Sequence, residues 1–310
     1  MRVTSFQRLA LTTTVLTYLL IAVGGIVRAS GSGLGCPDWP HCFGSWIPPV
    51  SAADLPPQFD AAKFNVVQTW TEYVNRLLGV SVGFAIVGTA VAAWWRHRRQ
   101  PRIVWPVVAA MLLTGFEGWL GGRVVAHALA PWIVTAHLVV ALLIVQLLLW
   151  ATVEAFADGG PASTVADAPL GWAAWAVTAL VLLQIALGTQ VRGGVDDALE
   201  HLPRDQALAA VGRVDGTHRD TAALVALAVI GLWAWTWQRH GPGSGVLRAA
   251  TLAGACVVLK VVAGMALTGL GLPPPVQVTH LTVASLLLGA LTWLALLAWR
   301  IPRAGSAAAR

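Results

Sequence analysis

Residues 131–153, PWIVTAHLVVALLIVQLLLWATV, decide the fold class of this chain. The stretch contains no Asp, Glu, Lys or Arg, and a helix of about 20 apolar residues is long enough to cross a bilayer core. Lipid offers the backbone no hydrogen-bond partners, so a run of this kind must be helical. The stretch therefore predicts a transmembrane helix that carries one histidine, His137, near its start.

Similar apolar runs occupy most of the 310 residues. Together with the first they make eight, at 9–27, 77–95, 103–125, 131–153, 171–191, 221–237, 246–270 and 275–299. Charged residues make up 11% of the chain and its mean hydropathy is +0.70, whereas soluble domains carry about 25% charged residues. A soluble multidomain enzyme and a disordered chain are thereby excluded. We expect an all-α integral membrane protein in the lipid bilayer.

The net charge of +6 does not indicate nucleic-acid binding, because the charges flank the apolar runs. Basic residues mark the cytoplasmic side of a membrane protein, and the arginine cluster in 96–102 places both termini in the cytoplasm. The loop 31–50 then lies on the outer face of the cell membrane. Cys36 and Cys42 of this loop are on the oxidising side, where they form either a disulfide or two unpaired thiols.

The two halves of the chain resemble each other at a spacing of 143 residues. Thr-Ala-His-Leu around His137 recurs as Val-Thr-His-Leu around His280, and Asn75 falls on His218. We therefore expect the eight transmembrane helices to form two repeat-related four-helix bundles. The expected parts are an N-terminal bundle at 1–153, a cytoplasmic linker at 154–170 and a C-terminal bundle at 171–310.

Three of the eight histidines are functional candidates. His137, His218 and His280 each fall in the first turns of a helix that starts at the outer face, where an ionisable residue is costly. The plain alternative is a hydrogen bond between helices. Imidazole binds zinc, copper and iron, but the usual Cys and carboxylate ligands of zinc are absent around His280. Two histidines from two helices fit the axial positions of a haem iron.

The two halves differ in how many strong ligands they offer. His218 and His280 would form an axial pair in the second half, whereas the first half has His137 opposite Asn75, a poor iron ligand. Three basic residues at the outer end of the second half are candidates for binding propionates: Arg192, Arg213 and Arg219. We expect one retained haem in the second half and a looser site in the first.

Two acidic residues are further candidates. Glu72 lies one turn before Asn75 on the same helix face, and we expect its carboxylate to point into the first-half pocket as an acid, a base or a stabiliser of positive charge. The alternative is an acid favoured by the helix N-terminus. Glu117, inside the third run, has Lys260 as its mate at the 143-residue spacing. We expect these two opposite charges to pair between the bundles.

Taken together, these residues resemble a known family. Gly-Gly-Ile-Val-Arg28, the loop up to Cys42 and Glu-Tyr-Val-Asn-Arg76, with the three histidines, are similar to haem A synthases of the CtaA type. The resemblance covers almost the whole chain. It implies a haem-dependent oxidoreductase that oxidises the C8 methyl group of haem O to a formyl group, giving haem A for cytochrome oxidase.

The resemblance also implies ligands for two haems. Haem b, with its iron, would be the cofactor, and His218 and His280 would be its axial ligands. The substrate haem O would bind in the first half at His137, with Asn75 and Arg76 beside it. A haem O synthase, the protohaem farnesyltransferase, is the implied partner, and the sequence leaves open whether the chain forms a homo-oligomer.

Glu72 would be the catalytic carboxylate by this resemblance, and Cys36 and Cys42 match the family's outer-loop disulfide. One position departs from the family, which usually has histidine where this chain has Asn75. Either His137 alone holds the substrate haem, or substrate handling is altered; the retained motif residues favour an active enzyme. The alternative function is a membrane b-type cytochrome that only transfers electrons and needs no Glu72. A transporter is disfavoured, because no pair of broken helices marks a midplane site.

Overall fold

The computed structural model describes residues 3–157 and 167–299, and within them it contains helices and no strands. Eight helices are long and apolar enough to cross a membrane: α1 (Ser5–Ala29), α2 (Val66–His97), α3 (Pro101–Ala126), α4 (Pro131–Ala157), α5 (Ala168–Leu199), α7 (Arg213–Arg239), α8 (Gly245–Gly269) and α9 (Pro274–Ala298). Shorter turns connect them: η1 (Ala52–Asp54), η2 (Ala61–Lys63) and α6 (Arg204–Ala210). The predicted all-α membrane protein with eight spans is confirmed.

Two of the helices begin well before their apolar runs. Asn65 caps α2, because its side-chain oxygen accepts from the backbone N–H groups of Val67 and Gln68 at 3.0 and 3.2 Å. At the start of α7 the backbone of Gly212 has a φ of 64°, which glycine adopts without strain. The first turns of α7 are polar and those of α2 mix polar with apolar residues, so hydropathy alone places the start of each helix too late.

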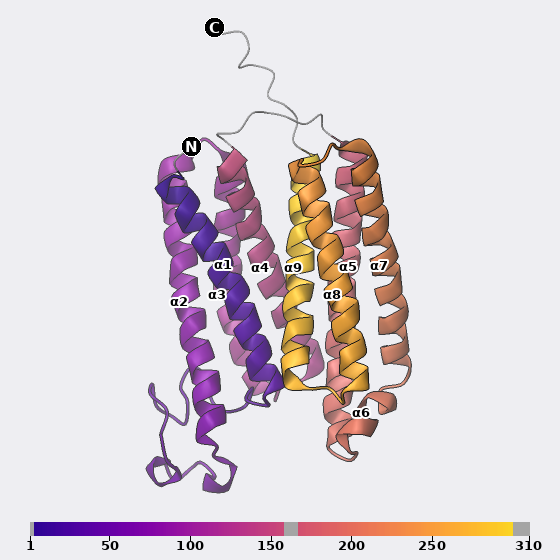
Figure 1. Cartoon of the computed structure of the whole chain (residues 1–310). Coiled ribbons are helices and arrows are strands. Elements are labelled where there is room, and N and C mark those ends of the chain that lie inside the picture. The colour runs from indigo at the N-terminus through magenta and orange to yellow at the C-terminus, as the bar shows by residue number, and fades with distance from the viewer. Residues whose placement is uncertain (1–2, 158–166, 300–310) are drawn as a thin grey trace.

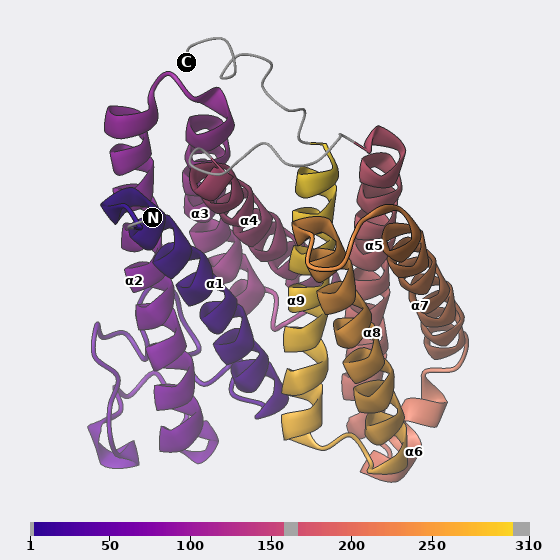
Figure 2. The ribbon, with the colours of Figure 1, turned by 45° about the horizontal axis from the view of Figure 1, so that its top comes forward.

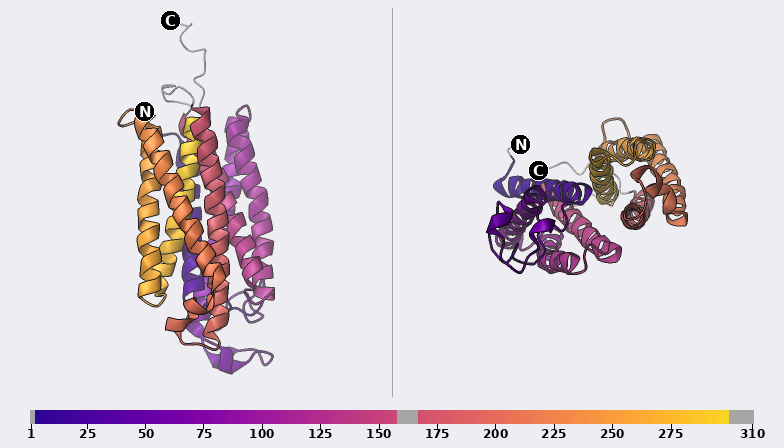
Figure 3. Two further views of the ribbon diagram at one scale, coloured as in Figure 1. Left: turned by 90° about the vertical axis from the view of Figure 1, so that its right-hand side faces the viewer. Right: turned by 90° about the horizontal axis from the view of Figure 1, so that it is seen from below.

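The helices form two groups that lie side by side (Figure 1). In the first, α1 contacts α2, α2 contacts α3, α3 contacts α4 and α4 contacts α1; in the second, α5, α7, α8 and α9 close a similar ring. The view along the helices separates the two rings (Figure 3, right). They meet where α9 packs against α1 and α4, and α4 also contacts α5. Of the eight spans, α9 is the most buried.

The start of α1 and the end of α9 lie at one end of the molecule, and segment 30–65 and α6 lie at the other (Figures 1 and 2). Both ends of the predicted linker 154–170 are helical, since α4 continues to Ala157 and α5 begins at Ala168. Residues 158–166 lie outside the described part of the chain. The domain boundaries and the origin of the two bundles in a sequence repeat stay predictions.

Tyr18 of α1 fits against Gly289 of α9 at the contact between the bundles. A Cβ atom at 289 would overlap the tyrosine hydroxyl and would lie 3.2 Å from the ring carbon Cζ. We expect Gly289→Ala to lower the free energy of unfolding by about 1–3 kcal/mol, the usual cost of overpacking, and to lower the unfolding temperature in detergent. Tyr18→Phe in the same chain should restore most of this loss, because it removes the overlapping oxygen.

Gly254→Ala on α8 is the matched control for this pair, since a Cβ at position 254 would have no atom within 4 Å. It should leave the unfolding temperature nearly unchanged. An equal loss of stability in Gly289→Ala and in the Gly289→Ala, Tyr18→Phe double variant would contradict the expected role of the hydroxyl.

Candidate functional site

The segment between α1 and α2 forms a compact loop, which we call the Cys loop (residues 31–50). Cys36 and Cys42 form a disulfide with an S–S distance of 1.97 Å, and the two residues are 0% and 1% exposed. The predicted pairing is confirmed. The disulfide packs with aromatic side chains of the loop itself, of the segment that follows it and of α2: Phe43, Phe59, Phe64 and Tyr73. The loop therefore has a small apolar core of its own.

Glu72 of α2 binds this loop. Its Oε2 accepts from the backbone N–H of Cys36 at 2.8 Å, and its Oε1 accepts from Nε of Arg76 at 3.1 Å. Because α2 begins at Val66, Glu72 lies in the second turn, level with the Cys loop. The carboxylate is thus turned toward the loop, which differs from the expectation that it points into the pocket. Its catalytic role stays a prediction.

Arg76 holds the Cys loop through three backbone carbonyl groups. Its Nη1 donates to the oxygens of Asp38 and His41 at 2.8 and 2.9 Å, and its Nη2 donates to the oxygen of Cys36 at 3.2 Å. The guanidinium also lies over the ring of Trp39, 5.3 Å from the centroid. The planar fork of arginine makes several such bonds at once. Arg76 therefore organises the loop, whereas a contact with substrate stays a prediction.

Arg76→Lys tests this role. Lysine keeps the charge but lacks the fork, so we expect it to lose at least one charge-assisted hydrogen bond, and the Cys36–Cys42 disulfide should be reduced about tenfold faster. The measurement is labelling with a membrane-impermeant thiol reagent after graded reduction. Arg219→Lys is the control, because Arg219 pairs with Asp215 at the start of α7, in the other bundle. An unchanged rate of disulfide reduction in Arg76→Lys would show that Arg76 does not hold the Cys loop in place.

In the first bundle, His137 of α4 lies against a glycine of α3. A Cβ atom at Gly121 would lie 3.5 Å from Cε1 of His137, in ordinary van der Waals contact with the ring. Nδ1 of His137 lies 3.0 Å from Oε1 of Glu117. On α2, the Oδ1 atom of Asn75 is buried and has no partner among the described residues. The predicted pairing of Glu117 with Lys260 is wrong, because each residue contacts a histidine of its own bundle.

The second bundle repeats this arrangement with two histidines. Cβ atoms at Gly188 and Gly264 would lie 3.1 and 3.6 Å from Cε1 of His218 and His280. Nζ of Lys260 donates to the backbone oxygen of His280 at 3.4 Å, whereas Nδ1 of His280 is buried without a partner among the described residues.

Sequence reasoning missed Gln184 of α5. Its Nε2 donates to the backbone oxygen of His218 at 2.7 Å and lies 3.0 Å from Nδ1 of the same residue. Its Oε1 accepts from the hydroxyl of Thr221. The available signal was a polar amide inside an apolar span, one turn before Gly188. Gln184 orients the imidazole of His218.

These features fit a haem better than a bare metal ion. The described residues contain no group of three or more His, Cys, Asp or Glu that could hold an ion. A haem iron needs only two axial ligands, and each of the three histidines lies against a glycine of a neighbouring helix. Buried polar atoms without a partner among the described residues occur in both bundles, among them Oδ1 of Asn75, Nδ1 of His137 and Nδ1 of His280.

The sequence matches the COX15-CtaA family, described as cytochrome oxidase assembly protein, over residues 7–292. The chain belongs to this family. A relative named Heme A synthase from Methylobacterium sp. (strain 4-46) is 31% identical, with 88% of this chain and 86% of the relative covered. Another of that name from Rhizorhabdus wittichii is 26% identical, with 90% of each chain covered. The predicted family resemblance is confirmed.

In this COX15-CtaA family member, Arg192 lies where the two bundles meet. Its Nη2 pairs with Asp196 at 2.8 Å, and its Nη1 donates to Oε1 of Gln277 at 3.0 Å. Arg28 of α1 pairs with the same Asp196 and so links the first bundle to α5. The predicted propionate role of Arg192 is not tested by these contacts, which tie the guanidinium to α5 and α9.

The other two propionate candidates lie at the start of α7. Arg219 pairs with Asp215 at 2.7 Å and its side chain is 56% exposed. Arg213 is exposed in the first helical turn. Both side chains have room to move toward a ligand, and their role stays a prediction.

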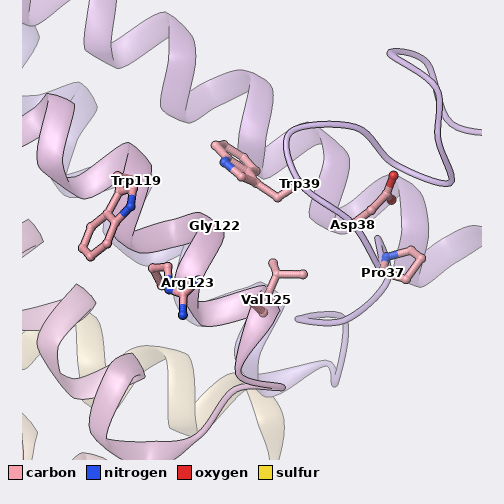
Figure 4. Close-up of a pocket in the computed structure, with 8 residues that line it drawn as sticks. Pro37, Asp38, Trp39, Trp119, Gly122, Arg123 and Val125 are labelled. Atoms are coloured by element: carbon pink, nitrogen blue, oxygen red, sulfur yellow. The ribbon is translucent and has the colours of Figure 1, made fainter.

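A cavity of about 350 Å³ separates the Cys loop from the end of α3 in this COX15-CtaA chain. Its lining residues are Pro37, Asp38, Trp39, Trp119, Gly122, Arg123, Val125 and Ala126. Figure 4 shows the indole of Trp39 reaching from the loop toward α3. A Cβ atom at Gly122 would meet this indole, and the preceding Gly121 faces His137. The loop and the His137 site therefore adjoin on one turn of α3.

Proposed function

We propose that this chain is a haem A synthase, a membrane oxidoreductase that converts haem O to haem A by oxidising the C8 methyl group to a formyl group for cytochrome oxidase. The observation that carries the proposal is the inequality of the two bundles. One has two glycine-backed histidines, and the other has His137 with Asn75 in place of a second strong ligand. A protein that only transfers electrons needs no second site of this kind.

In the second bundle, His218 and His280 would hold haem b, which supplies the redox chemistry when bound. Gln184 holds the start of α7 in place there through the hydrogen bond from its Nε2 to the backbone oxygen of His218. Arg192, Arg213 and Arg219 are the propionate candidates at this end of the bundle.

In the first bundle, His137 would bind the iron of the substrate haem O, and Asn75 would leave the opposite side without a strong ligand. Glu72 is proposed as the catalytic carboxylate. Its bonds to Cys36 and Arg76 hold it at the end of the bundle beside the Cys loop. Arg76 contributes by holding the loop in place over this end.

We also propose an orientation and a source of substrate. The arginine cluster in 96–102 lies at the end where α1 starts (Figure 1), so both termini would be cytoplasmic and the Cys loop would lie on the outer face. A haem O synthase in the same membrane would supply the substrate.

The test is expression of the full chain in bacteria that make haem O but lack haem A. Haems are extracted from membranes and separated by chromatography with mass analysis. Haem A is expected with the chain and absent with an empty vector. Stable haem b without any haem A would contradict the proposal and favour the electron-transfer cytochrome.

A further inference from the structure

We propose that Glu117 is a positioning residue for His137: it accepts the Nδ1–H of the imidazole and leaves Nε2 to the iron of the substrate haem. The inference rests on the proposed function, because it takes His137 as the ligand of haem O. With this partner, His137 would donate more electron density to a bound iron than the histidines of the second bundle would.

The geometry brings three buried polar atoms together. Oε1 of Glu117 lies 3.0 Å from Nδ1 of His137. Neither carboxylate oxygen, nor Nδ1, completes a hydrogen bond with any residue that the structure describes. The distance is already that of a hydrogen bond, and the broad torsion about the imidazole bond lets a small rotation align the N–H with the carboxylate.

Burial makes this pairing matter. The Glu117 side chain is only 15% exposed and sits inside the apolar span α3, where an unpaired carboxylate is costly. His137 is the described residue that reaches it. The imidazole in turn is 40% exposed, so one side of the ring is held at Glu117 while another side remains accessible to a ligand.

A metal-bound imidazole usually donates its other ring N–H to an acceptor. When Nε2 binds iron, the ring proton is on Nδ1, and a carboxylate that accepts it fixes the tautomer and raises the basicity of the ligand. More electron density then reaches the iron and stabilises its oxidised state. The effect is large in this bundle because Asn75 is a weak ligand, which leaves His137 as the single strong one.

The second bundle has no acidic residue at the position that corresponds to Glu117. At the position 143 residues later stands Lys260, whose Nζ donates to the backbone oxygen of His280. The amine is directed at this backbone oxygen, and Nδ1 of His280 stays without a partner among the described residues. At equivalent positions of the two bundles, an acceptor, Glu117, therefore lies beside His137, and a donor, Lys260, lies beside His280.

The experiment uses the purified full chain loaded with haem O and followed by electron paramagnetic resonance. With one strong ligand, the first-bundle haem should be high-spin, whereas the two histidines of the second bundle make a low-spin haem. Two variants assign the signal. His137→Ala should abolish the high-spin signal, and Asn75→His should convert it to low-spin.

Two substitutions of Glu117 separate its effects. Glu117→Leu removes the acceptor and should weaken haem O binding at the first site about 10–100-fold, the usual effect of losing a partner of a metal ligand. Glu117→Gln keeps an acceptor oxygen and removes the charge. It should bind haem O nearly as well as wild type but shift the reduction potential of the high-spin haem upward. The low-spin potential should not move.

Glu154→Gln is the matched control. It makes the same change on α4, about five helical turns from His137, and should alter neither the affinity nor the potential. If Glu117→Leu does not fold, the potential of Glu117→Gln still decides the question.

Two contrary outcomes are distinguishable. Unchanged affinity in Glu117→Leu and unchanged potential in Glu117→Gln, with the high-spin signal still lost in His137→Ala, would overturn the role of Glu117 and leave the proposed function intact. If His137→Ala retained the full high-spin signal, the ligand assignment of the first bundle would fail, and the role of Glu117 would fail with it.

Discussion

Replacing His218 or His280 by alanine is expected to abolish the reduced haem b spectrum of the purified protein. Each change would remove one of the two proposed axial ligands, and the nearby Lys260 is directed at a backbone oxygen. The haem iron would keep only one axial ligand from the protein, and most of the haem would dissociate from the bundle. The measurement is haem content per protein together with the reduced absorption spectrum.

His201→Ala is the control for both variants, because His201 is a surface residue whose side chain is 81% exposed. It should leave the spectrum and the haem content unchanged. Unchanged spectra in both His218→Ala and His280→Ala would remove these residues as ligands of haem b.

Glu72→Gln is expected to lower the production of haem A by about 100-fold or more, the scale of acid–base and electrostatic contributions to catalysis. The substitution keeps the size of the side chain and removes its charge. Haem b content should stay close to wild type, because His218 and His280 lie in the other bundle. Haem composition by chromatography gives both values from one extract.

The contacts of Glu72 require a second readout. The carboxylate accepts from Cys36 N–H and from Arg76, and a glutamine would turn an NH₂ donor toward one of these donors. Disulfide reduction should therefore be measured in the same variant. Lost haem A with a protected disulfide would assign Glu72 to the chemistry. Lost haem A with rapid reduction would make it an anchor of the Cys loop.

Asp215→Asn is the matched control, since Asp215 forms the corresponding pair with Arg219 at the start of α7. It should lower haem A production far less than Glu72→Gln does. Normal haem A production in Glu72→Gln would remove the carboxylate from the proposed mechanism.

The sequence by itself determined the membrane architecture. A span such as 131–153 must be helical in lipid whatever surrounds it, so eight apolar runs were enough to predict eight helices. Loop spacing left a disulfide between Cys36 and Cys42 and two unpaired thiols both open, and the family resemblance implied the disulfide. The histidines stood out because ionisable groups are costly in apolar spans.

The tertiary structure decided where the polar side chains of these helices point. Position 72 was known to share a helix face with position 75, but only the path of the Cys loop turns Glu72 and Arg76 toward the backbone of residues 36–41. Similarly, the 143-residue spacing paired Glu117 with Lys260 as equivalents, whereas packing puts each against a histidine of its own bundle. Helical periodicity fixes directions within one helix, and the rotation of a helix against its neighbours depends on packing along its whole length.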